Sequence, residues 1–564
     1  MADDDTIPRR PVVWTIAGTD SGGGAGIHAD TRALDAFGVH GACAVAAVTA
    51  QHSLAVTHVE PVSPAVLDAQ LEALAADMPP DAVKTGLLAS VENLRVVVEH
   101  VRRLRARFPE RAIPLVVDPV FGATTGASFA SEALRVAYRE ELLPLATLAT
   151  PNVAEARALV PSSQLLGPEP LARAWRAFGV RAVVVTGGDS DRLAEEELEQ
   201  LSTARLASRL AEIDSRAAWA HDWLDAEHGQ RSRGWLASRR IETEHDHGTG
   251  CVFAAAAAAA MAHGFVAADA VVLAKMATSE GLRHAYAAGG GAGPVAPRAG
   301  FASRLANLPV LNPLPGADSR FAFPAMPEHT RGLYAIVDSS EWVARVLAEG
   351  VRLVQLRIKE APGEVLVREI RAAVAIARAV GATLIVNDHW ELALELGAHG
   401  VHLGQDDLAG ADIDALHHAG LLLGISTHSY WEVCRARALR PSYIACGPIH
   451  ATTLKQMPWI PQGDANLAYW CTLLHDTPVV AIGGMDAPRA RAAMQAGAWA
   501  VAVVGAITRS DHPGAAIAAR GSSLRVIAPT TATAHAPASI AARARPASMP
   551  PMATTGVSCS SAHQ

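Results

Sequence analysis

The stretch VVWTIAGTDSGGGAGIHAD, residues 12–30, joins an apolar run to a helix-like segment through a cluster of glycines. Glycines between a strand and a helix let backbone N–H groups approach a ligand closely. No Gly-Lys-Ser/Thr follows the glycines, so the turn is not a Walker-type phosphate loop. A plain glycine turn is the alternative. The stretch therefore predicts a βα unit, with a candidate ligand site where its strand ends.

Further short apolar runs follow, and each alternates with a longer helical pattern. They include VKTG from Val83, LVVDP from Leu115 and AVVVTGG from Ala182. Strands that alternate with helices predict a mostly parallel sheet covered on both faces. We expect this α/β domain to span residues 11–288, after a tail of residues 1–10.

A second glycine motif, HDHGTGCVFAAAAAAA from His245, opens an Ala-rich segment. Free N–H groups and the positive end of a helix would face one spot there, which suits a phosphoryl group. A glycine turn before a buried helix is again the alternative. The apolar run from Val252 to Ala262 is too short for the roughly 20 residues that span a bilayer.

Composition excludes several classes of protein. The chain has 564 residues, 50% of them hydrophobic, and a formal charge of −8, which indicates two or three packed cores. No run of Lys and Arg suggests a nucleic-acid surface. Six cysteines without a C-x-x-C pair are no disulfide framework, and the acidic start is no secretory signal. We therefore expect a cytoplasmic protein that binds no membrane and no nucleic acid.

The second half predicts a (β/α)8 barrel over residues 329–510. Eight short apolar runs, from LYAIVD at Leu333 to AVAVVG at Ala500, each precede a helix-like segment. A Gly/Pro/Ala-rich linker, residues 289–328, would join the halves. Residues 193–230 look like a helical insertion without assigned function, and the Ala/Pro/Ser/Thr-rich residues 511–564 look like a disordered tail.

Polar side chains gather where the barrel strands are expected to end. Gln355, Arg357 and Lys359 alternate along one strand and so share a face, where two cations suit a pyrophosphate. Asp388 and Asp407 follow two other strands and suit Mg²⁺, whereas Asp406 fits a helix N-cap better. Glycines after the last two strands suit phosphate, or simply barrel packing.

The motifs of the first half resemble those of the hydroxymethylpyrimidine/phosphomethylpyrimidine kinases of the ribokinase superfamily. AGTDSGGGAGIHAD, TAQHS, KTG, DPVFGATTG, TPNVAEA and HGTGC occur in that family's order. The resemblance implies a ribokinase-like α/β/α sandwich that uses ATP and Mg²⁺. By match, the pyrimidine would be held by Gly18, Asp30 and Gln51. The ATP phosphates and Mg²⁺ would lie among Asp118, Asn152, Glu155, Thr186 and Gly188. The anion hole would be formed by Gly248, Gly250 and Cys251.

Two positions bear on this resemblance. Most ribokinase relatives have an Asp where Cys251 stands, and the pyrimidine kinases have Cys. A thiol at a helix N-terminus has a lowered pKa, so we hypothesise that Cys251 accepts the proton of the substrate hydroxyl; a small buried cysteine is the alternative. Thr186 stands where many of these kinases have Lys, which removes one phosphate contact.

The second half resembles thiamine phosphate synthase over residues 331–508, in GLYAIVD, QLRIK, NDHW, GVHLGQDD, GISTH, YIACGPI, KQMP and AIGG. By match, the pyrimidine diphosphate would be held by Gln355, Arg357, Lys359 and Asn387. Asp388 and Asp407 would hold Mg²⁺. Pyrophosphate or thiazole phosphate would be bound by Ser426, Thr452, Lys455, Gly484 and Gly505. The resemblance implies loss of pyrophosphate to a pyrimidine-methyl cation, which the thiazole nitrogen captures. Leu454 replaces a family hydroxyl, so we expect a weaker affinity for thiazole phosphate.

The chain is thus expected to make thiamine phosphate from small-molecule substrates, namely hydroxymethylpyrimidine, its phosphates and thiazole phosphate. Two other functions stay open at this point: a pyridoxal-type kinase fused to another phosphate-binding barrel, and a chain in which one half only binds thiamine precursors. Kinases that resemble the first half are usually dimers, so a homodimer is also expected. Whether the diphosphate passes directly between the halves cannot be read from the sequence.

Overall fold

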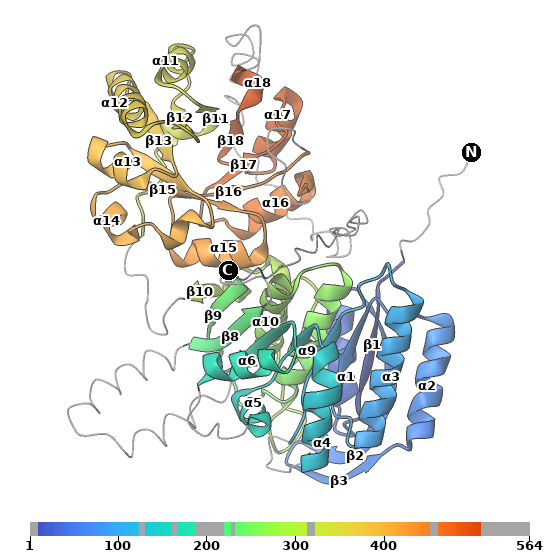
Figure 1. The fold of residues 1–564 in the computed structure, drawn as a ribbon. Helices are drawn as coiled ribbons and strands as arrows, with labels where there is room; N and C mark the ends of the chain where they lie inside the picture. Colours follow the sequence, from blue (N-terminus) through green and yellow to red (C-terminus); the bar gives the residue numbers. More distant parts are fainter. Residues whose placement is uncertain are drawn as a thin grey trace, which may run out of the picture.

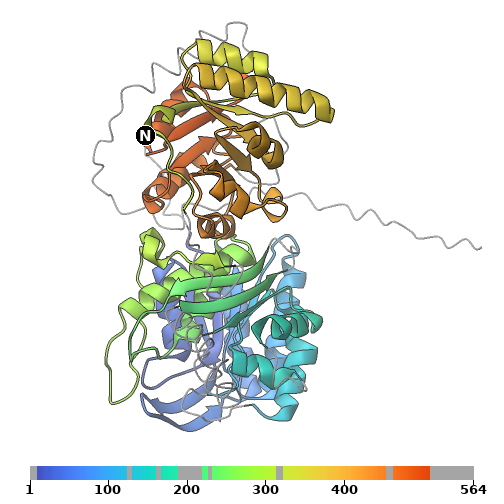
Figure 2. The same ribbon diagram turned by 90° about the vertical axis from the view of Figure 1, so that its left-hand side faces the viewer.

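The computed structural model describes residues 9–122, 130–160, 167–187, 219–226, 232–312, 322–451 and 461–508. They form a ten-stranded sheet domain and a closed barrel, which Figure 1 shows one above the other. In the second view the barrel again meets the sheet domain at one end only (Figure 2). No helix among the described residues is long and apolar enough to cross a membrane.

The first domain is built on a sheet with strand order β10-β9-β8-β7-β6-β5-β4-β1-β2-β3. The six strands from β7 to β2 in that order run parallel, as predicted, and β3, β8, β9 and β10 are antiparallel to their neighbours. The strands are β1 (Val12–Gly18), β2 (His40–His52), β3 (Ala55–Pro61), β4 (Ala82–Thr85), β5 (Leu115–Val117), β6 (Leu148–Ala149), β7 (Ala182–Thr186), β8 (Trp219–Ala226), β9 (Arg233–Arg239) and β10 (Val310–Asn312).

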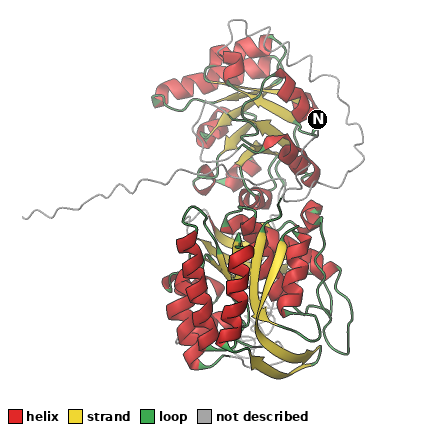
Figure 3. Cartoon of the chain, turned by 90° about the vertical axis from the view of Figure 1, so that its right-hand side faces the viewer, coloured by secondary structure: helices red, strands yellow, loops and turns green. Residues whose placement is uncertain are grey.

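Helices cover both faces of this sheet (Figure 3). One core contains side chains of α1, α9 and α10, and a separate core contains those of α2 to α6. The buried alanines of α9 let it pack closely against α10, which confirms the predicted buried helix. The helices are α1 (Gly26–Ala36), α2 (Pro64–Asp77), α3 (Val91–Arg107), α4 (Glu132–Ala137), α5 (Val153–Leu159), α6 (Pro168–Ala177), α9 (Thr249–Ala262) and α10 (Ala267–Arg283).

Two predicted boundaries need correction. The first part of the expected linker belongs to the sheet domain, because β10 pairs with β9 and the Phe301 side chain is fully buried against Phe37. The expected helical insertion contains strand β8, since residues 219–226 pair antiparallel with β7. Residues 188–218 and the expected C-terminal tail lie outside the described residues.

The second domain is a closed barrel of eight parallel strands, as predicted. Its interior is filled by large side chains such as Tyr334, Tyr443 and Ile385. The strands are β11 (Gly332–Val337), β12 (Leu353–Leu356), β13 (Thr383–Asn387), β14 (Gly400–Leu403), β15 (Leu422–Thr427), β16 (Tyr443–Cys446), β17 (Val479–Ile482) and β18 (Ala500–Val503).

Helices surround the barrel (Figure 1). Ser339 and Ser429 cap α11 and α15, because each side chain accepts the N–H of the third residue beyond it. The helices are α11 (Ser340–Ala348), α12 (Gly363–Ala379), α13 (Trp390–Leu396), α14 (Ile413–His418), α15 (Tyr430–Ala438), α16 (Gly463–Leu473), α17 (Ala487–Gln495) and α18 (Gly505–Thr508).

Candidate active sites

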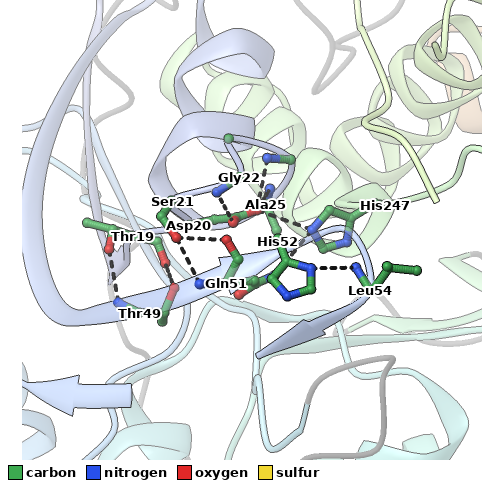
Figure 4. A network of polar contacts seen from close by, with 12 residues as sticks. Thr19, Asp20, Ser21, Gly22, Ala25, Thr49, Gln51, His52, Leu54 and His247 are labelled. Carbon is green, nitrogen blue, oxygen red and sulfur yellow. Dashed lines mark hydrogen bonds and ion pairs between the residues drawn. The ribbon is translucent and has the colours of Figure 1, made fainter. Parts of the chain in front are cut away.

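The glycine loop after β1 is organised by the carboxylate of Asp20 (Figure 4). Its Oδ1 accepts the N–H of Gly22 at 2.8 Å, and its Oδ2 accepts those of Gly24 at 2.8 Å and Ala25 at 2.7 Å. Burial alone would raise the pKa of Asp20, but the hydrogen bond to His247 and those to the loop amides outweigh it, so the pKa lies below its usual value. The carboxylate therefore stays ionised and fixes the loop.

His247 brings the two glycine motifs together. Its Nε2 lies 3.2 Å from Asp20 Oδ2 and 3.2 Å from Gln51 Nε2. Gly248 has a φ of +85°, and a side chain on it would meet the carbonyl oxygen of Gly24. Residues 17–30 and 245–251, which are far apart in the sequence, therefore meet at one place in the fold. Sequence reasoning named Gln51 but missed Asp20 and His247, although both lie inside the motifs it quoted.

A cavity of about 260 Å³ opens beside this loop. Asp20, Gly24 and His247 form one side of it, and the hairpin between β2 and β3 and the Gly-rich residues 288–294 form the other. The loop N–H groups and the start of α9 lie at the carboxyl edge of the sheet, the usual position for ligands in open α/β sheets. This edge is the candidate kinase site.

A buried ionic cluster lies behind the loop. Lys84 Nζ is 3.0 Å from both carboxylate oxygens of Asp30, and Thr15 Oγ1 donates to Asp30 Oδ2 at 2.5 Å. The side chains of Lys84 and Asp30 are fully buried. The predicted pyrimidine ligand Asp30 is therefore occupied by internal partners and supports the site from behind. Sequence reasoning missed Lys84, a lone charge in an apolar strand within the quoted KTG motif.

Asp118 carries the features of a cation ligand. Its Oδ2 is buried without a hydrogen-bond partner, and Lys84 Nζ lies 3.4 Å from it. Burial, and then the neighbouring Asp30, raise the pKa of Asp118, while Lys84 opposes the rise. One ammonium group faces two carboxylates, so negative charge is in excess. A hard divalent cation would offset that excess, and the residues therefore fit Mg²⁺.

The structure contradicts the predicted acidity of Cys251. Burial raises the pKa of its thiol to about 12, and the carboxylates of Asp118 and Asp30 add to the rise. Lys84 opposes the rise without cancelling it. At neutral pH the thiol therefore keeps its proton, so Cys251 is not a ready proton acceptor. Sequence reasoning saw the helix N-terminus and missed the two buried carboxylates beside it.

The predicted ATP-binding residues lie side by side at the ends of β6 and β7. Asn152 forms an isolated bridge with Thr186, whose N–H donates to the carbonyl of Pro151 at 2.9 Å. Asn152 and Glu155 form a reciprocal capping box at the start of α5, with hydrogen bonds of 3.0 and 2.8 Å. Glu155 is thus engaged in a helix cap. Gly188 lies outside the described residues.

In the barrel, the predicted metal ligands Asp388 and Asp407 lie close enough for their charges to interact. Burial and then the charge of Asp407 raise the pKa of Asp388, and Arg357 opposes the rise. Asp388 has a φ of +63°, a strained value for a residue with a side chain. Asp407 accepts the N–H of Gly404 at 3.0 Å. Two carboxylates that repel one another fit a divalent cation.

A hydrogen-bonded chain crosses the barrel interior beneath these carboxylates. Gln355 Nε2 donates to Tyr334 Oη at 2.8 Å, which lies 2.8 Å from Tyr443 Oη. His402 lies 3.0 Å from Tyr443 through Nδ1 and 2.8 Å from the Ser426 hydroxyl through Nε2. Burial, and then Arg357, lower the pKa of His402 to about 4, so its ring is neutral. The chain links the predicted ligands Gln355 and Ser426 through three residues that sequence reasoning missed.

The remaining barrel residues lie at the same strand ends. Asn387 ends β13 and is buried, whereas Lys359 is exposed beyond β12. Gly484 follows β17 with a φ of +63°, and a side chain there would meet the carbonyl of Ala451. Gly505 begins α18. Asp406 is the N-cap residue of the turn Asp407–Ala409, as expected, although its side chain does not make the capping hydrogen bond. Thr452, Leu454 and Lys455 lie outside the described residues.

The two domains match two protein families. Residues 20–296 match phosphomethylpyrimidine kinase, and residues 333–507 match thiamine monophosphate synthase. A chloroplastic thiamine biosynthetic bifunctional enzyme of Arabidopsis thaliana is 31% identical, over 91% of this chain and 92% of its own length. The chain belongs to the family of bifunctional thiamine biosynthetic enzymes. A probable enzyme of this family from rice is 32% identical over 86% of this chain and 83% of its own length.

Shorter relatives match each half alone. A thiamine-phosphate synthase of Serratia proteamaculans is 50% identical over 35% of this chain and 92% of its own. A phosphomethylpyrimidine kinase structure from Clostridium difficile is 26% identical over 48% of this chain and 99% of its own, with a TM-score of 0.37. By its family, the bifunctional enzyme joins a hydroxymethylpyrimidine and phosphomethylpyrimidine kinase to a thiamine phosphate synthase barrel. Because the family match runs through both halves, it favours thiamine phosphate synthesis over the two other functions that the sequence left open.

Proposed function

We propose that the glycine-loop edge performs both phosphorylations and that the polar mouth of the barrel performs the coupling. The observation that supports this most is the convergence of distant motifs. Asp20 and His247, which are 227 positions apart, are joined at the start of α9, and Asp388 and Asp407 act on one another at the barrel strand ends. Each site combines carboxylates, buried in the kinase and half-buried in the barrel, with donors suited to phosphate.

At the kinase site, the hydroxymethyl oxygen attacks the γ-phosphorus of ATP, ADP leaves, and the hydroxyl proton is released. A phosphate oxygen of the monophosphate then attacks a second ATP in the same way. The N–H groups of Gly248, Gly250 and Cys251 stabilise the transferring phosphoryl group. Cys251 contributes a neutral thiol to this anion hole, because its pKa of about 12 keeps it protonated.

The residues that would hold Mg²⁺ are Asp118 in the kinase and Asp388 with Asp407 in the barrel. Bound there, the ion would neutralise phosphate charge and orient the leaving groups. Asp118 supplies a buried oxygen without a hydrogen-bond partner. Arg357, beside Asp388, would add a fixed positive charge on the diphosphate.

In the barrel, the bond between the pyrimidine methylene carbon and the bridging oxygen breaks, and its electron pair leaves with pyrophosphate. The thiazole nitrogen then donates its lone pair to the methylene carbon. No proton is transferred, which agrees with a site of fixed charges and a neutral His402. The side chains position the substrates through Gln355 and Ser426, which the buried chain holds in place.

Separate assays of the two half-reactions test these assignments. Asp118→Asn is expected to abolish formation of the diphosphate and to leave coupling of supplied diphosphate intact. Asp407→Asn is expected to do the reverse, and its amide oxygen can still accept the Gly404 N–H. If either variant lost both half-reactions while staying folded, the division of labour would be wrong.

We also propose a cellular compartment and an oligomeric state for the chain. The five cysteines in the described residues are all free thiols, which suits the reducing cytoplasm. The plant relatives are named as chloroplastic enzymes. A homodimer through the kinase domain remains our proposal, and sedimentation of the purified chain would test it.

A further inference from the structure

The two domains are joined by a buried interface at one edge of the kinase sheet. Asp269, near the start of α10, accepts the N–H of Trp431, at the start of the barrel helix α15, at 2.9 Å. Phe265 packs edge-on against Tyr430, with ring centroids 5.9 Å apart. Asp269, Tyr430 and Trp431 are each less than a tenth exposed. The junction is therefore built like a protein interior, with its polar groups hydrogen-bonded.

A second set of contacts widens this interface. Tyr469, on barrel helix α16, donates its hydroxyl proton to the carbonyl oxygen of Ala302 at 2.8 Å and receives that of Tyr430 at 2.9 Å. Strand β10, at the end of the kinase sheet, packs against α15. Figure 1 shows α15 lying between the barrel and the kinase domain. Contacts from three parts of the kinase domain, at α10, Ala302 and β10, therefore fix the orientation of the barrel helices α15 and α16.

The kinase site lies at the opposite edge of the sheet. Helix α9 begins at the anion hole and runs 14 residues, or about 21 Å, across the sheet. Its last turn leads into His263, whose ring contacts the carbonyl of Phe37 at 3.0 Å, and then to Phe265 at the interface. In Figure 1 the hairpin of β2 and β3, which lines the site cavity, is at the end of the molecule remote from the barrel.

We infer that the pyrimidine diphosphate is released to solvent before the barrel binds it, because the docked domains separate the two sites by the depth of the kinase sheet. This inference rests on the proposed function of both sites. The described contacts of the interface set the orientation of the domains. Because both domains belong to one chain, the two activities are then produced in equal amounts and kept close together.

Isotope dilution with the intact enzyme tests this inference. Labelled hydroxymethylpyrimidine, MgATP and thiazole phosphate are supplied together with a large excess of unlabelled pyrimidine diphosphate. Release to solvent predicts that the label per thiamine phosphate falls by the factor by which the diphosphate pool is diluted. Thiamine phosphate that keeps the specific activity of the labelled precursor would overturn the inference.

A mixture of two full-length variants gives an independent readout. Asp118→Asn and Asp407→Asn chains are mixed so that each active half equals its amount in a wild-type control. Release predicts that the mixture matches the wild-type rate of coupled synthesis, and a lower rate with both half-reactions intact would overturn it. A wild-type chain that lacks one half-reaction altogether would refute the proposed function instead, so the two failures are distinguishable.

Discussion

Lys84 Nζ lies 3.0 Å from both carboxylate oxygens of Asp30 and 3.4 Å from Asp118 Oδ2, and its side chain has no solvent exposure. The pKa of Lys84 is raised, because the two carboxylates outweigh the effect of burial. The ammonium therefore stays charged and holds both carboxylates in fixed positions beneath the anion hole. Lys84 is thus a positioning residue of the kinase.

Lys84→Met is expected to destabilise the kinase domain by about 3–5 kcal/mol, because it leaves the buried carboxylates of Asp30 and Asp118 without their cation. The double variant Lys84→Met/Asp30→Asn removes the Lys84–Asp30 pair together and leaves only Asp118 without its cation, so it is expected to recover part of that stability. Denaturant unfolding measures both effects. If the single variant were as stable as the double, the cluster would not be energetically coupled.

Cys251→Ala is expected to keep kinase turnover within about tenfold of the wild type, the loss of roughly one hydrogen bond. The reason is that a thiol with a pKa of about 12 cannot serve as the resting base. Steady-state kinetics with both pyrimidine substrates measure the change. Losing several orders of magnitude, with folding intact, would restore the base role that the sequence suggested.

Tyr443→Phe is expected to destabilise the barrel by about 1–3 kcal/mol, because the Nδ1 of His402 and the hydroxyl of Tyr334 each lose a buried partner. We also expect KM for the pyrimidine diphosphate to rise, since Gln355 loses its support. Tyr469→Phe, which changes a tyrosine at the interface, is the matched control. Equal effects of both substitutions on KM would refute a positioning role for the buried chain.

Asp269 predicts a pH-dependent junction. Burial, and then the charge of Glu432, raise the pKa of Asp269 to about 7, from 3.8 in an exposed carboxyl group, although the Trp431 N–H opposes the rise. Because the docked carboxyl binds its proton more tightly, docking is strongest below about pH 4 and weakens as the pH rises through about 7. Small-angle scattering at pH 5.5 and 8.5 would show a larger radius of gyration at the higher pH. Asp269→Asn is expected to remove this change, and an unchanged pH effect in that variant would assign it to other groups.

Much of the fold could be predicted because its signals are local. Glycine turns after apolar strands and the eight-fold barrel pattern depend on short segments of the chain, and both were confirmed. The linker was misjudged because Gly and Pro also occur where a chain packs closely, as Gly291 does against Ser53. Strand β8 was missed because its polar residues interrupt the apolar run by which the other strands were recognised.

The site could be predicted only in part. Motif residues such as Gln51 and Asp407 could be proposed from the sequence because they stand at or just beyond the ends of strands. Lys84, His402 and Tyr443 act from within strands, and their roles depend on partners far away in the sequence. The pKa of Cys251 was predicted in the wrong direction for the same reason, since its nearest charges come from three other elements.

The most direct test of the whole account is a one-pot assay of the purified chain with hydroxymethylpyrimidine, MgATP and thiazole phosphate. We predict that thiamine phosphate forms after a lag in which the diphosphate accumulates, with two ATP consumed for each product. Diphosphate without thiamine phosphate would contradict the barrel assignment, and no phosphorylation at all would contradict the kinase assignment.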